Sequence, residues 1–113
     1  MPPPPPALRR PVRLLLAAGP ARPGVASLVE AAIAEARAGA DVSVLFSEEG
    51  LDGLIGPFVG RLRAAGIATS LCARSARERR MEPATLPSDV RWSSLTAFLA
   101  EGPADARLWT ALP

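Results

Sequence analysis

The chain has 113 residues, of which 49% are hydrophobic, and its formal net charge is only +2. This length suits one domain with a modest core, and the apolar content excludes a disordered protein. All 13 basic residues are arginine, and there is no histidine and one cysteine, which excludes an intramolecular disulfide, a single-chain Cys/His zinc site and any histidine-activated nucleophile.

The first residues are rich in proline, which predicts an extended, solvated polyproline II tail over residues 1–11. Recognition of this tail by a proline-binding module is the alternative role. A single α/β domain is expected over residues 12–113.

The pair Arg9-Arg10 stands before an apolar run, as in a signal peptide. That run, Val12 to Ala18, is interrupted by Arg13 and has no convincing cleavage site after it, so we expect a first buried strand there instead. No stretch reaches the roughly 18 apolar residues of a membrane span. The expectation is therefore a cytoplasmic protein without a membrane segment.

A loop over residues 19–24 contains two prolines and two glycines, and an apolar face of helical period follows it. The residues of this face are Val25, Leu28, Val29, Ala32, Ile33 and Ala36. Such a loop can hold a phosphate at a helix start. It matches neither a P-loop nor a dinucleotide fingerprint, so a plain turn is favoured and no cofactor is expected.

The second strand is expected over 42–46, and Ser47 to Gly50 would form the loop at its carboxyl end. Glu48 and Glu49 in this loop can face the same crevice as the cysteine and accept or relay a proton. They can also be ordinary acidic residues at a helix start. A second apolar helical face follows at Leu51, Leu54, Ile55, Phe58, Val59 and Leu62. Pro57 within it predicts either a kink or a helix that starts near this proline.

The third strand is expected over 67–71, and Cys72 stands where strand gives way to a short helix over 73–80. In a parallel sheet this junction lies at the carboxyl edge, where ligands gather. Backbone N–H groups at a helix start, with Arg74 and Arg77 nearby, would favour a thiolate. The alternative is that Cys72 is a small buried hydrophobe of the core.

Arg74, Arg77 and Arg80 recur every three residues, so they are expected on one side of this short helix. Such a cluster can bind phosphate, RNA or an acidic partner, but a solvated helix face is favoured. No aromatic residues interleave, so nucleic-acid binding is poorly supported.

The remaining elements are a loop over 81–89, a strand over 90–92, a helix capped by Ser93 or Ser94, and a last strand over 106–111. Trp92 and Trp109 are expected in the core or at a subunit contact. Strand and helix alternate, which predicts a three-layer α/β/α sandwich with a parallel, flavodoxin-like sheet of about five strands.

Four segments in this order resemble the DsrE/DsrF-like family of small sulfur-relay proteins. They span about Val12 to Leu112. The first is Ala17-Ala18-Gly19-Pro20 after the first strand, and the second is Ala38 to Phe46 around the second strand. The third is Ala65-Gly66-Ile67 with Leu71-Cys72-Ala73-Arg74-Ser75 at the third strand, and the fourth is Leu86-Pro87 to Val90 with Ser93-Ser94-Leu95 at the closing strand and helix. The loop at Ser47 to Gly50 is shorter and poorer in glycine than is usual in the family.

The resemblance implies a homo- or hetero-oligomer, often a trimer or hexamer. It also implies that Cys72 carries a persulfide between a sulfur donor protein and an acceptor protein. Ser75, together with Arg74, Arg77, Glu48 and Glu49, would support the thiolate or bind an anion. Many relatives lack the cysteine, so the alternative is a non-catalytic, oligomerising module that binds a protein partner or a small ligand.

Overall fold

The computed structural model describes residues 9–113, apart from the side chain of Pro57, and these residues form one parallel five-stranded sheet with the strand order β4-β3-β2-β1-β5. The strands are β1 (Val12–Leu16), β2 (Val42–Phe46), β3 (Ala68–Cys72), β4 (Arg91–Ser93) and β5 (Arg107–Ala111). They fall within two residues of the predicted spans, and every pairing is parallel, as predicted.

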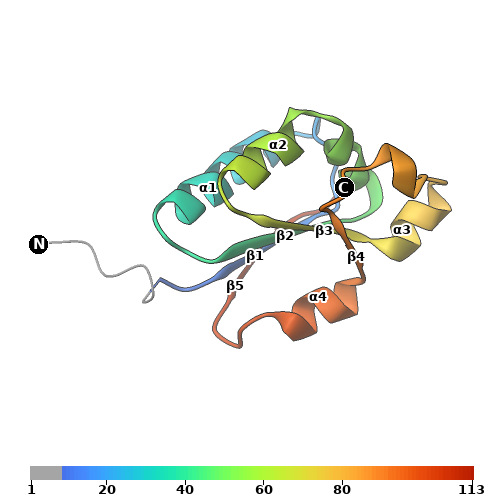
Figure 1. Ribbon diagram of the computed structural model, residues 1–113. Helices are drawn as coiled ribbons and strands as arrows, with labels where there is room; N and C mark the ends of the chain where they lie inside the picture. The colour runs from blue at the N-terminus through green and yellow to red at the C-terminus, as the bar shows by residue number, and fades with distance from the viewer. Residues whose placement is uncertain (1–8) are drawn as a thin grey trace, which may run out of the picture.

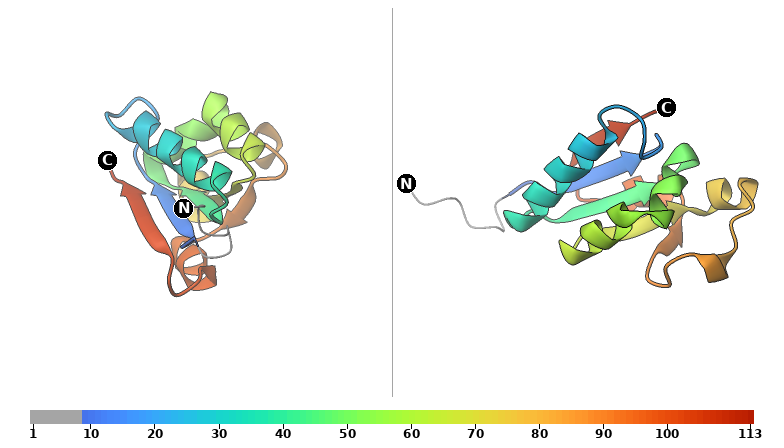
Figure 2. Two further views of the ribbon diagram at one scale, coloured as in Figure 1. Left: turned by 90° about the vertical axis from the view of Figure 1, so that its left-hand side faces the viewer. Right: turned by 90° about the horizontal axis from the view of Figure 1, so that it is seen from above.

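The helices lie on both faces of the sheet, which gives the predicted three layers (Figure 1). On one face lie α1 (Val25–Arg37) and α2 (Pro57–Ala64), and on the other lies α4 (Leu95–Glu101), as the end-on view in Figure 2 also shows. The short helix α3 (Ala73–Glu78) lies at the carboxyl edge. Flavodoxin itself orders its strands 2-1-3-4-5, so the likeness lies in the layers and the parallel sheet.

The direction of chain winding explains this distribution of helices. From β1 to β4 each strand is added on the same side of its predecessor, and β5 then returns to the far side of β1. Parallel crossovers are right-handed, so a reversal of direction moves the connecting helix to the opposite face. Helix α4 makes the returning crossover and is therefore alone on its face of the sheet.

The core lies between the sheet and the α1–α2 layer. Alternate residues of the central strands point into it, among them Val12, Leu14, Leu16, Val44 and Phe46, all at most 2% exposed. Four of the six residues predicted for the first helical face are fully buried, and Leu28 and Ala36 pack partly buried against them. Trp92 and Trp109 are also partly buried against the core.

The segment after β2 contains two helices of different type. A 3₁₀ helix, η2 (Glu48–Ile55), comes first, and α2 then starts at Pro57, which confirms the second of the two alternatives for this proline. Because the periodicity changes at this break, Ile55 leaves the apolar face and is 76% exposed, so its predicted burial is wrong.

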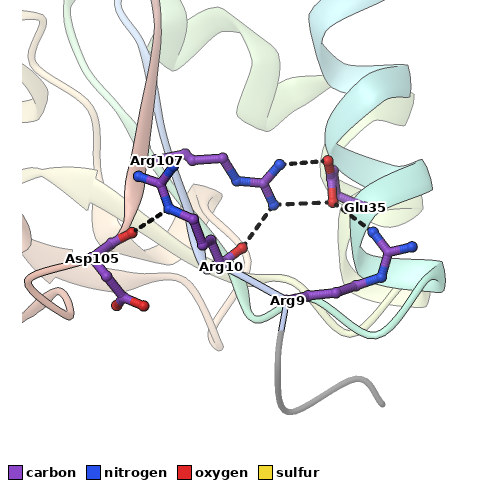
Figure 3. A network of polar contacts seen from close by, with 5 residues as sticks. All are labelled: Arg9, Arg10, Glu35, Asp105 and Arg107. Carbon is purple, nitrogen blue, oxygen red and sulfur yellow. Dashed lines mark hydrogen bonds and ion pairs between the residues drawn. The ribbon is translucent and has the colours of Figure 1, made fainter. Parts of the chain in front are cut away.

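A network of polar contacts joins the start of the domain to its end (Figure 3). Arg107 donates two hydrogen bonds to the carboxylate of Glu35, at 2.8 and 3.1 Å, and one to the carbonyl oxygen of Arg10 at 2.7 Å. Arg9 lies 3.6 Å from the same carboxylate, and Arg10 donates to the carbonyl oxygen of Asp105. Of the predicted tail 1–11, residues 1–8 lie outside the described residues, whereas Arg9 and Arg10 contact the folded domain.

Candidate functional site

The carboxyl edge of the sheet brings the ends of β2, β3 and β4 together. Cys72 is the last residue of β3, and its extended backbone (φ −77°, ψ 113°) also makes it the residue that precedes α3. It pairs with Ser93 of β4. Successive strand residues point to opposite faces, so Leu71 enters the core and Cys72 points to the face that carries α4. The predicted position of Cys72 at the strand–helix junction is therefore correct.

A cleft of about 450 Å³ opens at this edge. One side comes from the end of β2 and from α3, and the other from the start of α4. The lining residues are Ser47, Glu48, Cys72, Arg74, Ser75, Glu78, Ser94, Leu95 and Thr96. Cys72 is only 9% exposed, so the cleft is the route by which another molecule reaches the thiol.

Hydrogen-bond donors surround the sulfur of Cys72. Burial raises the pKa of this thiol, but hydrogen bonds from the Ser75 hydroxyl, the backbone N–H groups of Ser75 and Arg74, and the Ser47 hydroxyl together outweigh burial and lower the pKa below its ordinary value. These donors favour the charged form because a thiolate is the stronger acceptor. The site therefore combines limited access with a stabilised thiolate.

Ser75 stands at the centre of this arrangement, and the residue is only 3% exposed. Its hydroxyl lies 3.2 Å from the carboxylate of Glu48 and 3.3 Å from the hydroxyl of Ser47. A hydroxyl carries one proton, so Ser75 cannot donate to the carboxylate and to the sulfur at once. Ionisation of Cys72 is thus coupled to whether the Ser75 hydroxyl donates its hydrogen bond to the sulfur or to Glu48.

Glu48 reaches this position through an unusual backbone. Its φ of +50° lies in the left-handed region that residues with a β-carbon rarely adopt. The chain turns out of β2 into the 3₁₀ helix at this residue. Such a conformation costs about 1–3 kcal/mol and persists only where surrounding contacts fix it.

The arginines act differently from the prediction. The side chain of Arg74 is 86% exposed and pairs with Glu78 at 3.0 Å, and Arg77 is exposed on α3. Arg80 lies beyond the end of α3 with a φ of +54°. Serine hydroxyls and backbone N–H groups, rather than guanidinium groups, lower the pKa of Cys72. The cluster is the solvated surface that the sequence favoured.

Glu48 and Glu49 are directed to different places, although either was expected in the crevice. Glu49 accepts two hydrogen bonds from Arg22, at 3.0 and 3.1 Å, across a separate hollow beside the loop at 19–23. This contact, more than any other, lowers the pKa of Glu49 below its ordinary value. Only Glu48 of the two lines the cleft at Cys72.

Sequence reasoning did not single out five residues of the cleft, Ser47, Glu78, Ser94, Leu95 and Thr96, as site residues. Ser47 carried a usable signal, because it directly follows β2 just as Cys72 ends β3, and parallel strands end at one edge. Ser94 was expected as one of two possible helix caps, and its hydroxyl does accept from the Ala97 N–H at 3.0 Å.

Within residues 9–113 there is no group of three or more acidic, cysteine or histidine side chains placed to hold a metal ion. No helix in that range is both long and apolar enough to cross a membrane. Comparisons of the chain with protein-family models and with curated proteins find no match in either. The geometry of the cleft therefore carries the functional argument.

Proposed function

We propose that Cys72 is a sulfur carrier, which receives a sulfane sulfur as a persulfide and passes it to an acceptor thiol. One observation carries this proposal: the only thiol of the chain lies in a cleft, among hydroxyl and N–H donors that lower its pKa. The nucleophile in thiol exchange is the thiolate, so these donors raise the fraction of the reactive form near neutral pH. The resemblance to sulfur-relay proteins points to the same chemistry.

The exchange needs no histidine. The Cys72 thiolate attacks the outer sulfur of a donor persulfide, R–S–SH; a new S–S bond forms at Cys72, the old one breaks, and R–S⁻ leaves. In the second step an acceptor thiolate attacks the outer sulfur of the Cys72 persulfide, and the Cys72 thiolate is the leaving group. A low thiol pKa assists the second step because a stable thiolate leaves faster.

Alkylation tests the reactivity that this proposal needs. We expect iodoacetamide to label Cys72 in the native protein, with a pH midpoint below the roughly 8.5 of a free cysteine. Incubation with a persulfide donor should then add one sulfur atom to Cys72, as measured by mass spectrometry of the intact protein. The added sulfur should be removed by dithiothreitol.

The matched controls are Cys72→Ser, which should gain no sulfur, and denatured wild-type protein, which should lose the low pH midpoint. A Cys72 that is labelled only after denaturation would end the proposal. A native Cys72 that is alkylated but never gains sulfur from small persulfides or protein persulfides would contradict sulfur carriage while leaving the thiolate in place.

A second candidate function is that of an oligomerising module without catalysis. The observation that favours it is a set of large apolar side chains on the surface, from 41% to 76% exposed: Ile55, Leu95, Leu99, Leu108 and Leu112. Exposed apolar surface is typical of contacts with other subunits. This function requires no reactive thiol, so the alkylation experiment separates the two candidates.

A further inference from the structure

Helix α4 forms one side of the cleft but is weakly packed. Three residues at its start, Ser94, Leu95 and Thr96, line the cleft, and we call them the α4 wall. Phe98, at 2% exposed, is the only buried side chain of this helix. Leu95 and Leu99 are 41% and 46% exposed, although both are large and apolar. The α4 wall thus depends on one buried aromatic side chain, whereas the opposite side contains the buried residues Cys72 and Ser75.

Phe98 rests on Arg13 of β1. The guanidinium carbon of Arg13 lies 3.9 Å from the centre of the Phe98 ring, and the same group donates a hydrogen bond to the carbonyl oxygen of Phe98. Arg13 points to the α4 face because its neighbours Val12 and Leu14 enter the core. One arginine therefore makes both the ring contact and the backbone contact that join α4 to the sheet.

The end of α4 closes over the same arginine. A β-carbon at Gly102, the residue after α4, would lie 3.0 Å from Arg13 Nε. That nitrogen is buried and has no hydrogen-bond partner among the described residues. A further link is an ion pair between Arg91 and Glu101, whose side chains are 63% and 44% exposed, and such surface pairs add little. Arg13 therefore contacts α4 at its one buried side chain and at its end.

We propose that Arg13 is a positioning residue that holds the α4 wall against the sheet, and that α4 opens as a unit to admit large molecules to Cys72. Stability differs within a domain, and elements with few buried contacts open locally far more often than the core does. The cleft would then have one rigid side, which carries the thiol and its donors, and one side that yields. This inference concerns access to Cys72 and does not depend on sulfur transfer.

Two measurements test the inference on the intact protein. Hydrogen exchange should show faster exchange for the amides of α4 than for those of α1 in the wild type. The second measurement is the ratio of two alkylation rates at Cys72, with fluorescein maleimide as the large reagent and iodoacetamide as the small one. Both reagents react with the thiolate, so the thiolate fraction cancels in the ratio of their rates. The ratio therefore reports how easily a large molecule reaches Cys72, and not the pKa of the thiol. Arg13→Met should raise this ratio by roughly tenfold, because it increases local opening of α4.

Gly102→Ala provides a milder change, since its φ of −76° suits any residue and the new β-carbon would meet only the side chain of Arg13. Gly102→Ala should also raise the ratio of the two alkylation rates, and hydrogen exchange in α1 should stay unchanged. The controls are Arg37→Met, which removes an exposed arginine of α1, and Gly60→Ala, where a β-carbon meets nothing within 4 Å. Neither control should change the ratio.

Two results would overturn the inference. The first is α4 exchange as slow as that of α1 in the wild type, which is decisive even if Arg13→Met fails to fold. The second is an unchanged ratio in an Arg13→Met protein that folds like the wild type. Loss of sulfur loading with a normal ratio response would instead count against the proposed function alone.

Discussion

The backbone of Gly50 lies directly against the carbonyl oxygen of Leu16: a β-carbon at Gly50 would be 1.8 Å from that oxygen. The same oxygen accepts a hydrogen bond from the Ser47 N–H at 2.9 Å, and the Gly50 N–H lies 3.2 Å from the carbonyl oxygen of Ala17. The loop after β2 is thus joined to the end of β1 through close backbone contacts. These contacts place Ser47 and Glu48 beside Cys72.

Gly50→Ala is expected to destabilise the protein by about 3 kcal/mol, because the backbone of Leu16 and Ala17 leaves the new methyl group no room. The midpoint of urea unfolding should fall accordingly. Gly60→Ala is the control: its added methyl group meets nothing within 4 Å, and it should stabilise α2 by roughly 0.5–1 kcal/mol. A Gly50→Ala protein as stable as the wild type would contradict the close approach to Leu16.

Ser75→Ala should raise the pKa of Cys72, since it removes the strongest of the hydrogen bonds that lower it. Ser47→Ala should raise the pKa by less. The pH dependence of iodoacetamide alkylation measures both changes. Ser27→Ala, on the exposed side of α1, is the matched control.

Arg74→Ala and Arg77→Ala should each change the pKa of Cys72 less than Ser75→Ala does. Arg74 contributes through its backbone N–H, which alanine retains, and its guanidinium faces solvent beside Glu78. A larger rise in Arg77→Ala than in Ser75→Ala would show that long-range charge controls the thiolate. The readout is again the alkylation midpoint.

The Glu35–Arg107 pair predicts a loss of stability in acid. The hydrogen bonds from Arg107 lower the pKa of Glu35 in the folded protein, against an opposing effect of burial. A lowered pKa contributes stability that is present above the unfolded value of about 4.3 and is lost as the pH falls through the folded value. Glu35→Gln should therefore destabilise the protein at pH 7 and weaken the pH dependence below 4.3. Unfolding at pH 7, 4.5 and 3 measures this, with the exposed Glu82→Gln as control.

The exposed leucines predict association at micromolar concentration. Sedimentation velocity should show species larger than the 11.8 kDa monomer. Leu108→Glu and Leu112→Glu should return the protein to monomer without unfolding it, because these side chains are 52% and 66% exposed. Ala26→Glu on α1 should leave association unchanged. A wild-type protein that sediments only as monomer would argue against the oligomerising module.

The strands and α1 could be predicted because their burial has a simple period. A two-residue alternation or a helical face is visible in the sequence whatever the rest of the chain does. The predicted burial of Ile55 was wrong because η2 has a different period from the α-helix that follows. The close approach of Gly50 to the backbone of Leu16 could not be predicted from the sequence. A glycine in a loop has the same local sequence whether or not another backbone lies against it.

For the candidate site, the sequence located Cys72 and named Ser75 and the N–H groups at the helix start as its supports, but it did not single out Ser47. The strand–helix junction is a local feature, whereas the donors come from Ser47 and Ser75, which are 28 residues apart. Glu48 and Glu49 are adjacent and chemically alike, yet they line different hollows. The prediction gave too much weight to the charges of Arg74 and Arg77 on the thiolate, because an arginine close in sequence can turn its side chain to solvent.

The position of β5 next to β1 also bears on how the chain is made. A ribosome releases β1 early and residues 107–111 late, so β1, α1, β2, α2 and β3 can assemble while one edge of β1 has no neighbour. That open edge belongs to the strand with Val12, Leu14 and Leu16, and unpaired apolar strands are prone to aggregate. During synthesis one edge of the first strand therefore stays open until β5 pairs with it.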